Sequence, residues 1–355
     1  MELFESIMWK YIGQEYQVLT DNIRRTDIEK LAEKLACFDT IYFVSHGSSY
    51  NASMTVMPFF MKNAGVNVHC ITAGNFISSE TLASLIDNEK TLVVLISQTG
   101  NSRGTLQAAQ LAEKHGIKTL GISADDTATL KKYTDYFLTL NCGEEDSNAK
   151  TKGMSSTILV LLMLASCIGT IRGTITPEEK AAVYRELQLQ CAELDDFVCR
   201  SIQFSRENSV GKNMKDFYIV GSGMNYGLAL EAQIKMMETM CIPTCAVDSE
   251  EFSHGTHRSI NRDTTMLVIR TGRNATFAQS IYDYFNKLAN VIMIETFPEN
   301  KQKNVISITD CPLTESVMLI VAFIQVISAF APEYNHQDPN RDANNDFTDL
   351  VDTRI

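Results

Sequence analysis

The chain has 355 residues, of which 45% are hydrophobic and 21% charged, a balance typical of a soluble globular protein with room for two domains. Its formal net charge of −12 argues against a nucleic-acid surface, which needs clustered Lys and Arg, and against binding to an anionic membrane. An acidic chain can still hold phosphate locally, through backbone N–H groups and hydroxyls.

The N-terminal stretch has helical periodicity up to about Lys34. Its first residues, Met1 to Ser6, lack the basic region and the cleavage site of a signal peptide, so we expect a cytoplasmic protein. The longest apolar run, Ser156 to Ile168, has about thirteen residues, whereas a membrane-spanning helix needs roughly 20. This run therefore predicts a buried core helix.

A strand followed by a Gly/Ser turn occurs twice in the chain. The segments Ile41–Tyr50 and Phe217–Tyr226 align without a gap, with Gly47 on Gly223. A second apolar strand, a helix and a third strand follow each copy. They are Thr91–Ser97, Thr105–His115 and Lys118–Ile122 in the first half, and Thr264–Arg270, Phe277–Leu288 and Asn290–Ile294 in the second.

Short apolar strands that alternate with helices predict βαβ units and a parallel sheet with helices on both faces. We therefore expect an α/β fold of two similar flavodoxin-like, doubly wound domains. The expected organisation is an N-terminal helical segment (1–34), a first α/β domain (35–175), a helical connector (176–210), a second α/β domain (211–331) and a mostly extended or irregular tail (332–355).

The turns of the first domain are rich in hydroxyl groups. Ser45, Ser48 and Ser49 follow one strand, and Ser97, Thr99 and Ser102 follow the next. Ligands of parallel sheets bind at the carboxyl ends of the strands, where helix N-termini attract anions. The loops therefore predict a neutral phosphate site, although serines at such positions often only cap helices.

The corresponding loops of the second domain have fewer hydroxyl groups. They carry Met224, Asn225, Arg270 and Arg273. We therefore expect one phosphate site in each chain, in the first domain.

Other cofactor motifs are missing. The run from Gly221 to Tyr226 lacks the third glycine of a dinucleotide fingerprint, and no phosphate-loop lysine motif is present. Of nine cysteines the closest pair, Cys241 and Cys245, has no second Cys/His pair at zinc spacing. We expect neither a metal nor an organic cofactor.

Two of these loops, Ser48–Asn51 and Ser97–Ser102, resemble the phosphosugar loops of SIS (sugar isomerase) proteins. The pattern is most similar to the isomerase half of glucosamine-6-phosphate synthase (glutamine–fructose-6-phosphate aminotransferase) and to fructosamine-6-phosphate deglycases. The resemblance runs from about residue 35 to the tail and implies tandem SIS domains. The resemblance does not extend to the synthase's glutaminase domain, so we expect no supply of ammonia from glutamine.

The resemblance implies a role for each matching residue. Glu238 would shuttle a proton between sugar C1 and C2, Lys235 would be its neighbour, and His254 would assist ring opening across a homodimer interface. The phosphate would be bound by Ser48, Ser49, Ser97, Gln98, Thr99 and Ser102. The spacing alone would make Lys235 and Glu238 an ordinary surface ion pair, and a lone histidine is more often structural.

The chain departs from the synthase pattern in two places. The tail segment 338–345 has no lysine where the synthase uses one in ring opening. Lys150 and Lys152 bring cations to a loop where the synthase has a serine, so either is a possible contact for phosphate or for an acidic substituent. His336 and Arg341 of the tail are further possible contacts.

The leading functional hypothesis is a deglycase that converts a ketoamine 6-phosphate to an aldose 6-phosphate and a free amine. A phosphosugar isomerase or a hexosamine-6-phosphate deaminase shares the same residues and stays an alternative. A non-catalytic sugar-phosphate sensor would need the hydroxyl loops, but neither Glu238 nor His254.

Overall fold

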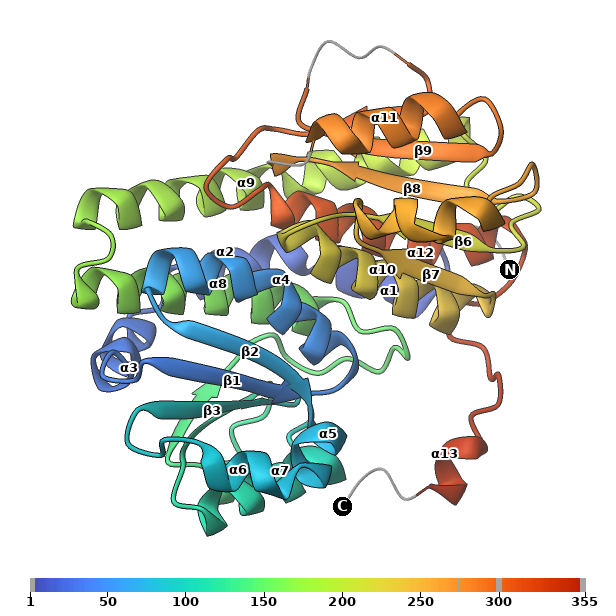
Figure 1. Cartoon of the computed structure of the whole chain (residues 1–355). Coiled ribbons are helices and arrows are strands. Elements are labelled where there is room, and N and C mark those ends of the chain that lie inside the picture. Colours follow the sequence, from blue (N-terminus) through green and yellow to red (C-terminus); the bar gives the residue numbers. More distant parts are fainter. Residues whose placement is uncertain (1–3, 273–274, 298–301, 352–355) are drawn as a thin grey trace. The chain divides into compact units, whose positions relative to one another are not determined.

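The computed structural model describes residues 4–272, 275–297 and 302–351 and contains two five-stranded parallel sheets (Figure 1). The strands are β1 (Thr40–Ser45), β2 (Asn67–Thr72), β3 (Thr91–Ile96), β4 (Lys118–Ser123), β5 (Tyr136–Thr139), β6 (Phe217–Val220), β7 (Thr244–Val247), β8 (Thr265–Arg270), β9 (Asn290–Glu295) and β10 (Val305–Ser307). The strand order is β2-β1-β3-β4-β5 in the first sheet and β7-β6-β8-β9-β10 in the second. The two sheets have the same topology, and the predicted doubly wound α/β fold is confirmed.

Helices connect the strands and cover both faces of each sheet (Figure 1). The α-helices are α1 (Ile7–Ile12), α2 (Glu15–Ile23), α3 (Asp27–Leu35), α4 (Gly47–Ala64), α5 (Ala73–Ser78), α6 (Glu80–Leu85), α7 (Arg103–Lys114), α8 (Lys152–Arg172), α9 (Pro177–Glu207), α10 (Met224–Met240), α11 (Ala275–Phe285), α12 (Val317–Tyr334) and α13 (Phe347–Leu350). Short 3-10 helices among the described residues include η1 (Thr129–Tyr133), η2 (Glu251–His254) and η3 (Thr256–Ser259).

The chain divides into two compact units, each described here by itself. Unit 1 consists of residues 1–17, 146–151 and 186–341, and unit 2 of residues 18–145, 152–185 and 342–355. Each unit holds one sheet. Unit 1 also takes in two short stretches, 1–17 and 146–151, that are distant in sequence from its main part.

In unit 2, alternate strand residues pack on opposite faces of the sheet. Val44 and Leu95, which are paired in register, join the apolar cluster with Phe76 of α5 and Leu106 of α7. Phe43 points the other way and packs edge-to-face on Phe60 of α4. The period of two residues along a strand therefore gives each sheet face its own helix layer.

Unit 1 repeats this arrangement. Val220, Val268 and Met293 of adjacent strands form an apolar cluster with Ile281 and Phe285 of α11. Helices α10 and α12 cover the opposite face (Figure 1).

Two helices, α8 and α12, are long and apolar enough to cross a membrane by length and composition alone. Their most apolar windows are, however, 89% and 94% buried. Burial of this extent is typical of the core helices of a globular unit. The core helix predicted around Ser156–Ile168 is confirmed and corresponds to α8.

Candidate functional site

In unit 2, the hydroxyl-rich loops lie side by side at the carboxyl edge of the first sheet. Strands β1 and β3 are neighbours, and Ser45 at the end of β1 pairs with Ile96 at the end of β3. The chain leaves β1 for β2 on one side and reaches β3 on the other, so this is the point where the strand order reverses. Open parallel sheets bind ligands at such a point.

The first loop brings the backbone of α4 to this edge. Gly47, with φ of +55°, begins the helix, and Ser48 and Ser49 occupy its first turn. The N-cap residue His46 makes no side-chain cap hydrogen bond. The first-turn N–H groups of an α-helix have no acceptor within the helix, and they carry a partial positive charge.

In the second loop, the hydroxyl groups bond to one another and to the loop backbone. Ser97 Oγ is 3.1 Å from Ser102 Oγ and accepts a hydrogen bond from the Gly100 N–H at 3.1 Å. Ser102 is the N-cap residue of α7, yet its side chain does not cap the helix. Thr99 is exposed. In this loop, then, Ser102 does not act as a side-chain cap of α7.

A buried carboxylate holds Gln98. The amide Nε2 of Gln98 donates to Glu145 at 2.7 Å, and Glu145 also accepts from the Lys152 and Gly153 N–H groups at the start of α8. A Cβ on Gly153 would lie 2.4 Å from the Gln98 amide. Glu145 escaped the sequence reasoning because its partners are separated from it by up to 47 residues.

In unit 1, three charged side chains share one face of α10. Glu231, Lys235 and Glu238 are spaced i, i+4 and i+7, a spacing that places them above one another on a helix. The Lys235 ammonium is 2.8 Å from Glu231 and 3.6 Å from Glu238. Lys235 is only 1% exposed, so the pair of Lys235 and Glu238 does not lie on the surface.

The Glu238 carboxyl is partly buried and electrostatically perturbed. Its side chain is 33% exposed, while its Oε2 atom is buried, faces the Lys235 ammonium at 3.6 Å and makes no shorter polar contact in the described part of the chain. Burial raises the pKa of this carboxyl above its ordinary value, and Glu231 raises the pKa further, whereas the charges of Lys235 and Lys150 oppose the rise. A carboxyl with a raised pKa can both take and return a proton near neutral pH.

His254 lies apart from this triad in the chain. It is exposed at the end of the 3-10 turn η2, and it makes no hydrogen bond or ion pair with Glu238 among the described residues. Arg341 of the tail donates to the Thr239 and Met240 carbonyls and so caps the C-terminus of α10.

The carboxyl edge of the second sheet is chemically different from that of the first. The Arg270 guanidinium is 2.5 Å from the buried Glu295 and 4.0 Å from the centre of the Phe297 ring. Asn225 donates to the Thr271 hydroxyl at 2.7 Å. Arg273 lies outside the described residues. The Arg270 cation is therefore already matched by a carboxylate.

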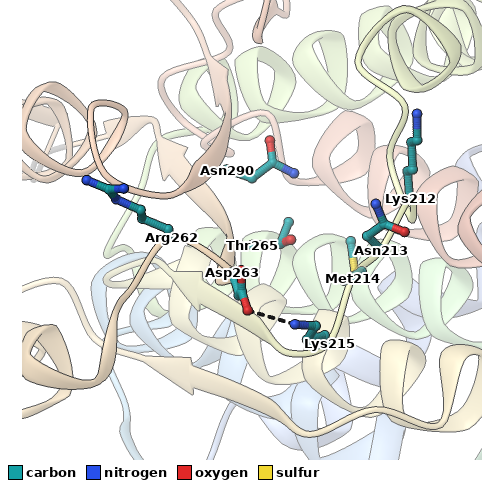
Figure 2. A pocket seen from close by; sticks show the side chains of 8 residues that line it. All are labelled: Lys212, Asn213, Met214, Lys215, Arg262, Asp263, Thr265 and Asn290. Atoms are coloured by element: carbon teal, nitrogen blue, oxygen red, sulfur yellow. Dashed lines mark hydrogen bonds and ion pairs between the residues drawn. The ribbon is translucent and has the colours of Figure 1, made fainter.

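A cavity of about 540 Å³ in unit 1 contains none of the predicted site residues. It lies at the amino ends of β6, β8 and β9, where Lys215 and Asp263 form an ion pair at 2.7 Å (Figure 2). Ligands of parallel sheets bind at the opposite ends of the strands. We assign no function to this cavity.

Comparison with known proteins shows which family the region that contains the hydroxyl loops resembles. Residues 34–167 match the SIS domain family. Over 255 residues the chain is 29% identical to the glutamine–fructose-6-phosphate aminotransferase of Thermococcus kodakarensis. That alignment covers 71% of this chain and 42% of the relative, so the matched part is less than half of that enzyme.

The fold has close matches among solved structures. A candidate phosphosugar isomerase from Clostridium difficile 630 has a TM-score of 0.89 and 27% identity, with 99% of each chain covered. The C-terminal domain of the glucosamine-fructose-6-phosphate aminotransferase of Francisella tularensis has a TM-score of 0.86 and 18% identity, with 96% of this chain and 99% of that chain covered. The resemblance predicted from the sequence is confirmed.

Proposed function

We propose that this protein is an enzyme that moves a proton between C1 and C2 of an aminated sugar 6-phosphate. The proposal is supported by the match of residues 34–167 to the SIS domain family and by the similarity of the fold to a candidate phosphosugar isomerase. Its most specific form is a deglycase of ketoamine 6-phosphates. It requires no metal or organic cofactor and works in the cytoplasm.

The hydroxyl loops of unit 2 hold the phosphate. Ser48 and Ser49 lie in the first turn of α4, and Ser97, Thr99 and Ser102 lie before α7. Two helix N-termini without side-chain caps supply N–H groups and partial positive charge, and Gln98 adds an amide. This set of donors is neutral, as suits a chain with a net charge of −12.

The observation that carries the proposal is the partly buried Glu238 carboxyl, whose Oε2 is held only loosely, by the Lys235 ammonium at 3.6 Å, in the described structure. It removes the C1 proton of the open-chain ketoamine while the C2 carbonyl oxygen gains a proton, which gives an enaminol. It then returns the C1 proton to C2 as the nitrogen loses its proton, which leaves a Schiff base at C1 and a hydroxyl at C2. Water adds to the Schiff base and releases the aldose 6-phosphate and the free amine, so the proton moved is conserved.

Two further residues complete the proposal. The Lys235 ammonium, 3.6 Å from Glu238, favours the ionised carboxylate that begins the cycle. His254 exchanges a proton with the ring oxygen during ring opening. His254 serves the neighbouring active site of a homodimer, which agrees with its exposed position in η2.

The test is a substrate panel with purified wild-type protein and the Glu238→Gln variant. The panel contains fructosamine 6-phosphates of several amino acids, fructose 6-phosphate with ammonium, and glucosamine 6-phosphate, and product is followed with a coupled dehydrogenase. We expect the wild type to turn over a ketoamine and the variant to lose at least about a hundredfold in kcat, the range of general acid–base catalysis. Lys287→Met, on the exposed surface, is the control.

Other results would change the function. Turnover of glucosamine 6-phosphate or fructose 6-phosphate alone would favour the deaminase or isomerase, an alternative supported by the whole-chain similarity to a candidate phosphosugar isomerase. Sugar-phosphate binding without turnover, unaffected by Glu238→Gln, would contradict an enzyme and favour a sensor.

A further inference from the structure

The side-chain amide of Gln98 has one defined orientation in the second hydroxyl loop of unit 2. Its Nε2 atom donates to Glu145 Oε2 at 2.7 Å. Glu145 is 8% exposed, and its carboxylate also accepts from the N–H groups of Lys152 at 3.0 Å and Gly153 at 2.9 Å. Carboxylate oxygens accept hydrogen bonds and do not donate them, so the end of the amide that faces Glu145 is its nitrogen.

Gly153 and the neighbouring backbone hold Gln98 in this place. A Cβ on Gly153 would lie 2.4 Å from the Cδ and Nε2 atoms of Gln98 and 2.7 Å from Oε1, so the whole amide packs on the glycine Cα. The backbone carbonyl of Gln98 accepts from the Ala124 N–H and from the Ser123 hydroxyl, both at 2.9 Å. Turning the amide over would bring its oxygen against the Glu145 carboxylate, so these contacts favour a single orientation.

This orientation leaves the carbonyl oxygen of the amide to a ligand. Gln98 Oε1 makes no hydrogen bond among the described residues, and the Gln98 side chain is only partly buried. The hydroxyl groups of the same loop can donate to phosphate, and so can the second N–H of the amide. The Oε1 atom only accepts, as phosphate oxygens do, so its partner is a donor on the sugar.

The chemistry of sugar 6-phosphates points to one such donor. The oxygen O5 is four bonds from the phosphorus atom, on the carbon next to C6. Because O6 carries the phosphate, the common ring forms of ketose and aldose 6-phosphates close through O5, which then has no hydrogen. In the open chain O5 is a hydroxyl and can donate.

Resting on the proposed function, we propose that Gln98 Oε1 accepts a hydrogen bond from the C5 hydroxyl of the bound sugar 6-phosphate and so favours its open-chain form. Glu145 is the positioning residue, because it fixes which end of the amide meets the sugar. The proton transfer between C1 and C2 requires the open chain. The tail segment 338–345 has no lysine to open the ring, so an interaction that favours the open chain assists this step.

The test measures the binding of three sugar alcohol phosphates by calorimetry. Glucitol 6-phosphate and 5-deoxyglucitol 6-phosphate are acyclic and differ only in the C5 hydroxyl, whereas 2,5-anhydroglucitol 6-phosphate is locked in a ring with an ether oxygen at C5. We expect the wild type to bind glucitol 6-phosphate about two- to tenfold more tightly than either of the others, the contribution of one neutral hydrogen bond. Inorganic phosphate reports on the phosphate site alone.

Two variants separate the roles of Gln98 and Glu145. Gln98→Met removes the acceptor and should bring the Kd ratio of the two acyclic compounds to about one. Glu145→Gln, which lets either end of the Gln98 amide face the ligand, should lower the same ratio and leave the Kd of inorganic phosphate nearly unchanged. A merely structural role of Glu145 would weaken all ligands alike. Gln107→Met, on the exposed face of α7, is the matched control and should keep the wild-type ratio.

Each outcome bears on one part of the inference, and thermal unfolding checks that the variants are folded. Equal binding of the two acyclic compounds by the wild type, or an unchanged ratio in Gln98→Met, would overturn the role of Gln98 and leave the phosphate site intact. Binding of the ring-locked compound as tight as that of glucitol 6-phosphate would overturn the preference for the open chain. No binding of inorganic phosphate or of any of the three compounds would reject the phosphate site of the proposed function and this inference with it.

Discussion

Glu238 combines two properties that usually exclude each other in a stable fold. Its Oε2 atom is buried, as a structural group would be, but in the described structure it has only the Lys235 ammonium at 3.6 Å in place of the short hydrogen bond that a structural carboxyl normally has. The sequence placed Lys235 beside it, since a spacing of three residues on a helix brings side chains together. It did not show that Lys235 is buried and bound more closely to Glu231, because burial depends on what packs on α10.

The raised pKa of Glu238 makes a prediction about stability and pH. An unperturbed Glu titrates near 4.5, and the folded group titrates higher, so ionisation weakens the folded state as pH rises above 4.5. The Glu238→Gln variant should therefore be inactive but at least as stable as wild type at about pH 8. The difference in thermal stability should shrink as pH falls toward 4.5.

Thermal unfolding of both proteins at several pH values measures this difference. A variant that is clearly less stable than wild type at the alkaline end would contradict the assigned environment of the carboxyl. Under the proposed mechanism, activity should fall as the solution is acidified, with the midpoint of the fall above pH 4.5, because the carboxylate is the form that would take the C1 proton.

At the level of elements, the sequence predicted the three central strands of each sheet but not the edge strands. Central strands such as β3 are buried at every position and appear as continuous apolar runs. The strands that the sequence did not reveal are β2, β5, β7 and β10, and all four lie at sheet edges. Edge strands are short or mixed in polarity because one side lacks a neighbour.

Element boundaries differed for local reasons. The predicted helix Phe277–Leu288 is observed as Ala275–Phe285. Helix α12 continues through Pro332 to Tyr334, three residues into the expected irregular tail. Its last turn is held because the buried Glu333 carboxylate accepts hydrogen bonds from Ser6 and Trp9. Residues 352–355 of the tail lie outside the described structure.

The turn between β3 and α7 depends on Gly100. Its φ is +64°, and an added Cβ would lie 2.3 Å from the Cβ of Ala128. Gly100→Ala should therefore destabilise the protein by more than the roughly 1–2 kcal/mol of a left-handed alanine. Gly173→Ala is the matched control, since Gly173 has φ of +72° and no neighbour within 4 Å.

Urea unfolding of the two variants measures this difference. Adding Ala128→Gly should recover stability in the Gly100 variant because it removes the closest clash. Equal losses in both variants, without recovery, would mean that the loop moves aside at little cost. If the loop binds phosphate, the Gly100 variant should also have a raised KM for the sugar phosphate.

On the scale of the whole molecule, two copies of one topology have acquired different chemistry. The first sheet presents hydroxyl groups and helix N-termini at its carboxyl edge, whereas the second has Arg270 paired with Glu295 at that edge. The sequence repeat predicted the shared topology, since it preserves the apolar strands and the glycines of the turns. The sequence repeat did not show that residues 1–17 and 146–151 belong to unit 1, because this assignment depends on contacts between distant parts of the chain.

The N-terminal stretch should be essential for unit 1. Glu333 is 1% exposed and accepts from the Phe4 N–H, the Ser6 N–H and the Trp9 indole. Deletion of residues 1–9 would leave this carboxyl buried without those donors and would also remove the buried Met8. We expect a loss of several kcal/mol in the free energy of unfolding.

Thermal and urea unfolding of the truncated chain measure this loss. Glu333→Met in the truncated chain should restore part of the stability, because it removes the buried polar group while keeping a side chain of similar length. A truncated chain as stable as wild type would contradict the assignment of residues 1–17 to unit 1.

The interleaving of the two units sets an order of events on the ribosome. All of unit 2 except residues 342–355 has been synthesised once residue 185 leaves the exit tunnel, whereas unit 1 must wait for residues 186–341. Until then Met8, Ile12 and Ala149 have no apolar partner from α12. The nascent chain thus carries an unfinished apolar surface through nearly half of its translation, and a chaperone that binds apolar segments of nascent chains would act during this interval.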